Sequence, residues 1–183
     1  MSTRPENSEQ ALRLLAELDR RSRASKRGLP TLEDDPDAWQ GLAFLLDGAR
    51  LVCPMNEIAE MFAYPETITR VPGAKDWVVG LVNVRGNLLP MMDLQRFFGG
   101  EPVARSKAAR LLVSRDRQVN TGLLVPGVLG MRQFSLRDRL TGIELEGPAA
   151  PFVSEAFYVD GQYWPIFNLR ALLNDSGFRV AAA

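Results

Sequence analysis

One segment of this chain occurs twice. Residues 84–98 align without a gap with residues 159–173, and every aligned pair is separated by the same 75 positions. The Val, Gly, Pro and Leu of the segment are identical in both copies, and Asp93 becomes Asn168. Asp or Asn at this point, after an apolar run, can cap a short helix. A solenoid needs at least about three repeats, so two copies predict two similar half-modules packed as a pseudo-symmetric pair.

Short apolar runs separated by turn residues make up the chain from Gly41 onward. The pairs Asp47-Gly48, Arg85-Gly86 and Asp160-Gly161 each lie between two such runs. Asp-Gly between apolar runs is typical of a two-residue hairpin turn. Many short strands joined by tight turns indicate a mainly β fold, either a barrel or a sandwich.

The first 38 residues have a different pattern. Residues 8–27 are predicted to form a helix that ends at Gly28 and Pro30, with leucines recurring at helical spacing. An acidic linker, 33–37, follows this helix. The charges can be a solvated surface, or the leucine stripe can dock on a partner or on the protein's own core. Residues 1–38 are therefore predicted to be an N-terminal helical extension with its linker.

The composition excludes several classes of function. The chain has 22 basic and 22 acidic residues, no histidine and one cysteine. No basic field for nucleic acid, no His-dependent nucleophile and no phosphohistidine carrier is expected. A single cysteine cannot form an intrachain disulfide, which favours a reducing compartment. Without an apolar leader or an apolar run of about 18 residues, the sequence predicts a cytoplasmic protein with no direct membrane insertion.

Catalytic motifs are absent from the sequence. No Gly-x-Gly-x-x-Gly follows a predicted strand, and no phosphate-binding loop or Gly-x-Ser-x-Gly elbow occurs. Acidic pairs such as Glu57 and Glu60 are typical of solvated faces more often than of acid–base pairs. Cys53 lies in an apolar run and is predicted to be a small buried side chain. We therefore expect no enzymatic activity, no cofactor and no metal site.

Arg85 is a candidate functional residue because of its position in a turn. It occupies the turn position that Asp160 occupies in the second copy, and Arg-Gly is not a favoured turn pair. A local rule relaxed in one copy suggests a role for Arg85 outside the turn. Alternatively, only Gly86 needs a positive φ and Arg85 points into water. An exposed guanidinium is well suited to binding a carboxylate on a partner.

Residues 71–94 resemble the signature of the CheW family of chemotaxis coupling proteins. The resemblance is specific at Asn83-Val84-Arg85-Gly86, followed by Pro90 and Asp93-Leu94, and it extends over roughly residues 41–173. The leucine-bearing N-terminal segment resembles the PilI-like branch, which serves type IV pilus (twitching motility) signalling. The resemblance implies that residues 39–180 form a CheW-like domain. This domain would consist of two intertwined five-stranded β-barrels related by a pseudo-two-fold axis.

The same resemblance implies a function and a set of site residues. It implies a non-enzymatic adaptor between the cytoplasmic tip of a methyl-accepting chemoreceptor and a CheA-type histidine kinase, located at membrane-associated receptor arrays through these partners. Arg85 matches the family's receptor-contacting arginine, with Asn83 and Gly86 beside it. Ile58 and Glu60 match the kinase-facing edge of the first barrel. The second half is too diverged for any residue to be assigned.

An oligonucleotide-binding barrel is the competing interpretation, because small five-stranded β-barrels often bind single strands. Such a protein needs a basic groove lined with stacking aromatic side chains. This chain has zero net charge and only 8% aromatic residues. The sequence therefore favours the adaptor, with no nucleic-acid partner.

Overall fold

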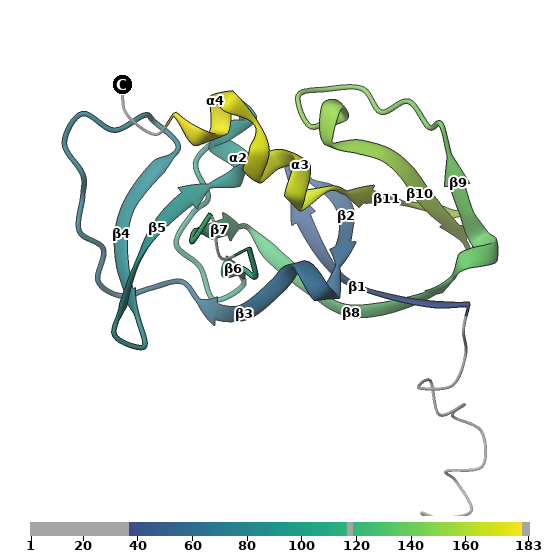
Figure 1. Ribbon diagram of the computed structural model, residues 1–183, viewed down its shortest axis with the longest axis horizontal. Helices are drawn as coiled ribbons and strands as arrows, with labels where there is room; N and C mark the ends of the chain where they lie inside the picture. Colours follow the sequence, from purple (N-terminus) through teal and green to yellow (C-terminus); the bar gives the residue numbers. More distant parts are fainter. Residues whose placement is uncertain (1–36, 117–118, 181–183) are drawn as a thin grey trace, which may run out of the picture. The chain divides into compact units, whose positions relative to one another are not determined.

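The computed structural model describes residues 37–116 and 119–180 (Figure 1). The predicted helix at residues 8–27 lies outside the described residues. The elements in chain order are β1 (Ala38–Leu46), β2 (Ala49–Pro54), η1 (Met55–Glu57), β3 (Ile58–Ala63), β4 (Val78–Val84), β5 (Asn87–Asp93), α2 (Leu94–Phe97), β6 (Arg110–Ser114), β7 (Gly122–Val125), β8 (Gly127–Ser135), η2 (Leu136–Asp138), β9 (Arg139–Thr141), η3 (Ala150–Phe152), β10 (Val153–Val159), β11 (Gln162–Phe167), α3 (Leu169–Asn174) and α4 (Ser176–Arg179). The fold is mainly β, as the sequence predicts.

The strands form two sheets. One has six strands in the order β8-β1-β2-β11-β10-β9, and the other has five in the order β3-β6-β7-β5-β4. Within the described residues, the first and last strands of each sheet do not pair with each other. The expectation of two closed five-stranded barrels is therefore wrong, and the strands form one sheet of six and one of five. The extra strand is β9, a three-residue segment paired with β10.

Each half of the chain contributes its first hairpin to the other half's sheet. The β1–β2 hairpin joins the C-terminal strands through a parallel pairing of β2 with β11, at Val52 and Ile166. The β6–β7 hairpin joins the earlier strands through a parallel pairing of β7 with β5, beginning at Met91 and Gly122. Met91 and Ile166 are equivalent positions of the repeat. The two halves are therefore related in their strand pairing and intertwined.

The repeated segment has the same local structure in both copies. The hairpins β4–β5 and β10–β11 share a register shift near the start of their first strands. Asp93 then caps α2 by accepting a hydrogen bond from the Arg96 N–H at 2.9 Å, and Asn168 caps α3 by accepting one from the Ala171 N–H at 2.9 Å. The predicted caps are confirmed. The copies differ in burial, because Asp93 is buried and Asn168 is exposed.

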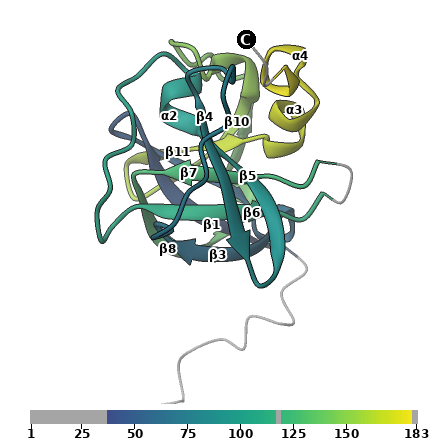
Figure 2. The same ribbon diagram turned by 90° about the vertical axis from the view of Figure 1, so that its left-hand side faces the viewer.

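The core explains why the two sheets hold together. Each sheet has a local cluster: Val82, Leu89 and Met91 belong to the first, and Phe134 stacks on Phe157 at 4.5 Å in the second. The largest cluster combines residues of both sheets with those of α2, α3 and α4. Figures 1 and 2 show that the β4–β5 turn projects from the five-stranded sheet away from α3 and α4. That turn is open to a partner.

Candidate protein-binding site

The turn between β4 and β5 holds an arginine in a left-handed backbone conformation. The φ angles are 51° at Arg85 and 87° at Gly86. Asp160 and Gly161 in the second copy have φ values of 52° and 75°, which defines the same type of turn. The alternative in which only Gly86 needs a positive φ is therefore wrong. A left-handed conformation costs a residue with a Cβ roughly 1–2 kcal/mol, and Asp or Asn tolerates it better than Arg.

Asn83 and Gly86 hold this turn in shape. The Asn83 Oδ1 accepts a hydrogen bond from the Gly86 N–H at 2.8 Å. A Cβ at position 86 would meet no atom within 4 Å, so the positive φ rather than lack of space favours glycine there. Both residues thus fix the position of Arg85. Their predicted contact with a receptor stays a prediction.

Arg85 extends back over β3. Its Nη1 lies 3.1 Å from the Glu60 Oε2, and the guanidinium carbon lies 5.7 Å from the centroid of the Phe62 ring. The side chains remain 72% and 41% exposed, so the ion pair contributes about 0–1 kcal/mol to stability. The structure therefore brings together Arg85, predicted to face a receptor, and Glu60, predicted to face a kinase.

Ile58 does not belong to this surface. Its side chain is 2% exposed and lies in the largest core cluster. The pairing of β3 with β6 shifts between Ile58 and Glu60, which places a bulge at Ala59. Ile58 is thus a core residue, although the family resemblance matches it to the kinase-facing edge. The assignment of Ile58 and Glu60 to a kinase contact is otherwise untested and stays a prediction.

A groove of about 730 Å³ lies beside Arg85. Its apolar part includes Phe62, Leu81 and Leu88, and the Leu88 side chain is 64% exposed on β5. Neither Phe62 nor Leu88 is a site residue predicted from the sequence. The alternation of side chains along a strand could have indicated that Leu88 is exposed, because it lies on the face of β5 opposite to that of its buried neighbour Leu89. An exposed apolar side chain beside a charged turn is typical of a protein-binding surface.

The second hairpin presents different chemistry at the equivalent positions. Tyr158 and Tyr163 replace Asn83 and Leu88, and their rings lie 4.7 Å apart across β10 and β11. Asp160 replaces Arg85. The two turns share a backbone and differ in charge, so they cannot bind the same carboxylate partner.

A carboxyl group lies at the junction between the sheets. Glu57 ends η1 and faces the start of α3, where the backbone N–H groups of Leu169 and Arg170 act on it. Its Oε2 is buried and makes no hydrogen bond within the part of the chain described. Burial raises the pKa of Glu57 above its usual value, and the Arg170 charge only partly opposes this.

The one cysteine of the chain is buried. Cys53 is 2% exposed, as predicted, and burial, followed by the nearby Glu57 charge, raises its pKa to about 12. Among residues 37–116 and 119–180, no group of three Cys, Asp or Glu side chains could hold a metal ion. No helix in the same residues is long and apolar enough to span a membrane.

These observations define a class of protein: a duplicated two-sheet β fold whose exposed site is a charged turn beside apolar side chains, suited to binding other proteins. The chain belongs to the CheW family, because the CheW-like domain model matches residues 40–177. Members of this family are scaffold or adaptor proteins that couple chemoreceptors to the CheA kinase.

Known proteins similar to this chain agree with this assignment. Protein PilI of Pseudomonas aeruginosa is 37% identical over 166 residues, which cover 90% of this chain and 92% of PilI. The chemotaxis protein CheW of Thermotoga maritima is 31% identical over 103 residues, covering 56% of this chain and 67% of that protein. The crystal structure of the scaffolding protein TtCheW from Thermoanaerobacter tengcongensis superposes with a TM-score of 0.64 at 21% identity. It covers 76% of this chain and 94% of TtCheW, which shows a shared fold.

Proposed function

We propose that this protein is a non-enzymatic adaptor that couples a methyl-accepting chemoreceptor to a CheA-type histidine kinase. The similarity to PilI over most of both chains supports a place in a type IV pilus (twitching motility) chemosensory system. In this proposal residues 39–180 carry the coupling function, in the cytoplasm at membrane-associated receptor arrays. The observation that carries it is the Arg85 turn, placed at one end of the fold beside exposed apolar groups.

The receptor contact is assigned to Arg85. Its guanidinium is 72% exposed at the side chain, and Glu60 is its one ion-pair partner within the described residues. A receptor carboxylate can therefore replace or share the Glu60 contact by paired hydrogen bonds. Asn83 and Gly86 support this contact by holding the turn, and Leu88 adds apolar area beside it.

The kinase contact is assigned to the β3 edge at Glu60. β3 is the terminal strand of the five-stranded sheet, and Met61 on it is 46% exposed. Ile58 supports this edge from the core rather than by touching a partner. Because Arg85 and Glu60 form an ion pair, the two contacts lie next to each other on one surface.

Binding of a fluorescently labelled cytoplasmic receptor fragment tests the receptor assignment. Arg85→Glu places like charge against the partner carboxylate and should weaken binding by about 2–5 kcal/mol if the contact is buried. Arg179→Glu, an exposed arginine on α4, is the matched control and should bind as the unmodified protein does. Equal receptor binding by Arg85→Glu and the unmodified protein, with equal melting curves, would refute the assignment.

The kinase assignment needs a separate measurement with the kinase alone. Glu60→Lys should weaken kinase binding, while Glu144→Lys, in the loop after β9, should not. If Glu60→Lys binds the kinase normally, the β3 edge is not the kinase contact.

A further inference from the structure

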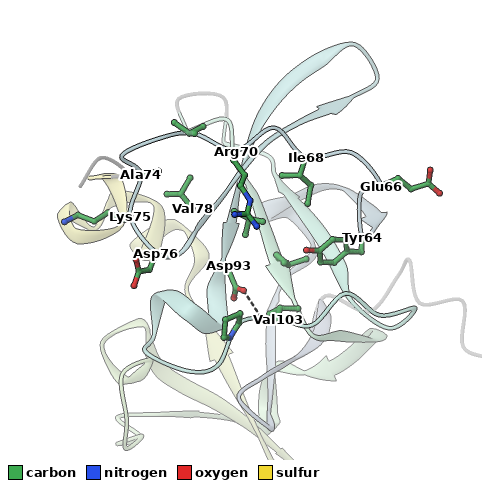
Figure 3. Close-up of a pocket in the computed structure, with 14 residues that line it drawn as sticks. Tyr64, Glu66, Ile68, Arg70, Ala74, Lys75, Asp76, Val78, Asp93 and Val103 are labelled. Carbon is green, nitrogen blue, oxygen red and sulfur yellow. Dashed lines mark hydrogen bonds between the residues drawn. The ribbon is translucent and has the colours of Figure 1, made fainter.

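A second cavity lies away from the Arg85 turn, near the start of β4. It has a volume of about 570 Å³, within the range of roughly 300–1,000 Å³ that suits small ligands. One wall is formed by the connection from β3 to β4, and the opposite wall by Asp93 and the segment that follows α2 (Figure 3). Arg85 lies at the other end of β4, so this cavity is separate from the proposed partner-binding site.

Three polar side chains line the inner part of the cavity: Tyr64, Arg70 and Asp93. Figure 3 shows the Arg70 guanidinium and the Tyr64 hydroxyl directed into the cavity and the Asp93 carboxylate on its wall, hydrogen-bonded to Val103, while Glu66 and Lys75 point outward. Asp76, also at the rim, pairs with Arg96 at 3.6 Å. The charges that face the cavity are therefore one cation and one anion.

The Asp93 carboxylate has acceptor capacity left. It is 3% exposed, and its two oxygens each accept one backbone N–H, from Arg96 at 2.9 Å and from Val103 at 2.7 Å. A carboxylate offers about four acceptor positions, so two remain for a ligand. Because both protein bonds come from backbone groups, the carboxylate is held in one orientation.

Arg70 supplies the opposite charge. Within the described part of the chain it makes no hydrogen bond and no ion pair, although its guanidinium carries five N–H donors. The Tyr64 ring is held against Arg105, whose guanidinium carbon lies 5.7 Å from the ring centroid. Between these polar groups the walls are apolar, with Ile68, Val78 and Val103 among the lining residues.

We propose that this cavity binds a small zwitterion of the α-amino acid class. The ligand carboxylate pairs with Arg70 and the Tyr64 hydroxyl, its ammonium group donates to Asp93, and its side chain packs on the valine-lined wall. A simple anion is repelled by Asp93 and a simple cation by Arg70, so a ligand with both charges fits best. The second half of the fold does not repeat the site, since Asn168, the counterpart of Asp93, is exposed.

Calorimetry on the full chain tests this proposal with the twenty free L-amino acids, and with acetate and methylammonium as single-charge probes. At least one amino acid should show saturable binding, and both single-charge probes should bind at least about tenfold more weakly, a difference of about 1.4 kcal/mol. Saturable binding of acetate as tight as that of the best amino acid would show a plain anion site. No saturable binding of any amino acid up to about 10 mM would also overturn the proposal.

Substitutions locate the binding in this cavity. Arg70→Gln changes an exposed side chain, so it should leave the melting curve unchanged and weaken binding of the amino acid about tenfold or more. Tyr64→Phe should weaken it less, because it removes one hydroxyl. Lys107→Gln, an exposed cation outside the cavity, is the control and should bind normally. Unchanged affinity in Arg70→Gln would place the ligand elsewhere and refute the site.

Discussion

Among residues 37–116 and 119–180, three two-residue turns have the same left-handed backbone, and one of these three begins with arginine. Asp47, Arg85 and Asp160 have φ angles of 47°, 51° and 52°. The two aspartates suit this conformation, and the arginine does not. Arginine at position 85 therefore costs the turn some stability. We infer that this residue serves the contacts of its side chain rather than the formation of the turn.

Replacing Arg85 with Asn should separate stability from binding. Asn adopts the left-handed region more readily, so Arg85→Asn should raise the free energy of unfolding by about 0.5 kcal/mol despite losing the weak Glu60 pair. The same variant should bind the receptor fragment more weakly. Urea unfolding and a binding titration measure the two effects. Asp160→Arg is the matched control, expected to lower stability; a stability loss in Arg85→Asn would contradict the argument.

Glu57 should make the fold less stable as the pH rises. Its pKa is raised in the folded state above the usual 4.5, so between these values the folded state holds more protons than the unfolded state. The free energy of unfolding therefore falls as the pH increases through this range. Glu57→Gln removes that loss, because the amide carries no charge at any of these pH values.

We therefore expect Glu57→Gln to be more stable than the unmodified protein at pH 7, with a smaller difference at pH 4. Urea unfolding at several pH values measures this difference. Glu144→Gln, an exposed loop variant, serves as the control and should show no such change with pH. The stability difference between Glu57→Gln and the unmodified protein is compared at the two pH values. If Glu57→Gln gains less at pH 7 than at pH 4, the Arg170 charge outweighs the effect of burial on Glu57.

At the scale of elements, the hairpins and their caps could be predicted and the pairing between distant strands could not. Turn residues and the repeat locate β4–β5 and β10–β11, because these depend on neighbouring residues. The exchange of first hairpins between halves depends on pairings such as Val52 with Ile166, which no local pattern encodes. The N-cap residues Asp93 and Asn168 were predicted for the same local reason.

The candidate site was predicted in part. Arg85 and its turn partners follow from the motif, whereas the contact between Arg85 and Glu60 depends on how β3 packs beside the hairpin. Ile58 was misjudged because a two-residue spacing does not tell which face of β3 is buried, and the bulge at Ala59 changes the local register. Phe62, the ring under Arg85, could not be identified without that packing.

Substitutions in β3 should separate core from surface. Ile58→Ala removes a buried side chain and should lower the free energy of unfolding by about 2–4 kcal/mol. Glu60→Ala removes only a half-exposed ion-pair partner and should change it by less than about 1 kcal/mol. Urea unfolding of both variants checks this. A loss below about 1 kcal/mol for Ile58→Ala would mean that its side chain is not core.

At the scale of the whole molecule, the exchanged hairpins make the two halves one folding unit. Each sheet needs strands from both halves of the chain, and the largest core cluster is shared between the sheets. Residues 37–100 expressed alone lack β6 and β7, so their five-stranded sheet lacks its central strands. This fragment should show no cooperative melting transition, while residues 37–180 should show one. A cooperative transition in the fragment would contradict the shared core.

In the proposed function, this protein bridges two partners without catalysing a reaction itself. An adaptor with adjacent contacts raises the effective concentration of each partner for the other, so weak single contacts can give a stable assembly. Reconstitution on a sizing column tests this most directly, with a receptor cytoplasmic fragment, the histidine kinase and this protein. Receptor and kinase should co-migrate only when this protein is present, and the Arg85→Glu variant should retain the kinase and lose the receptor. Equal co-migration without the protein, or displacement of one partner by the other, would contradict it.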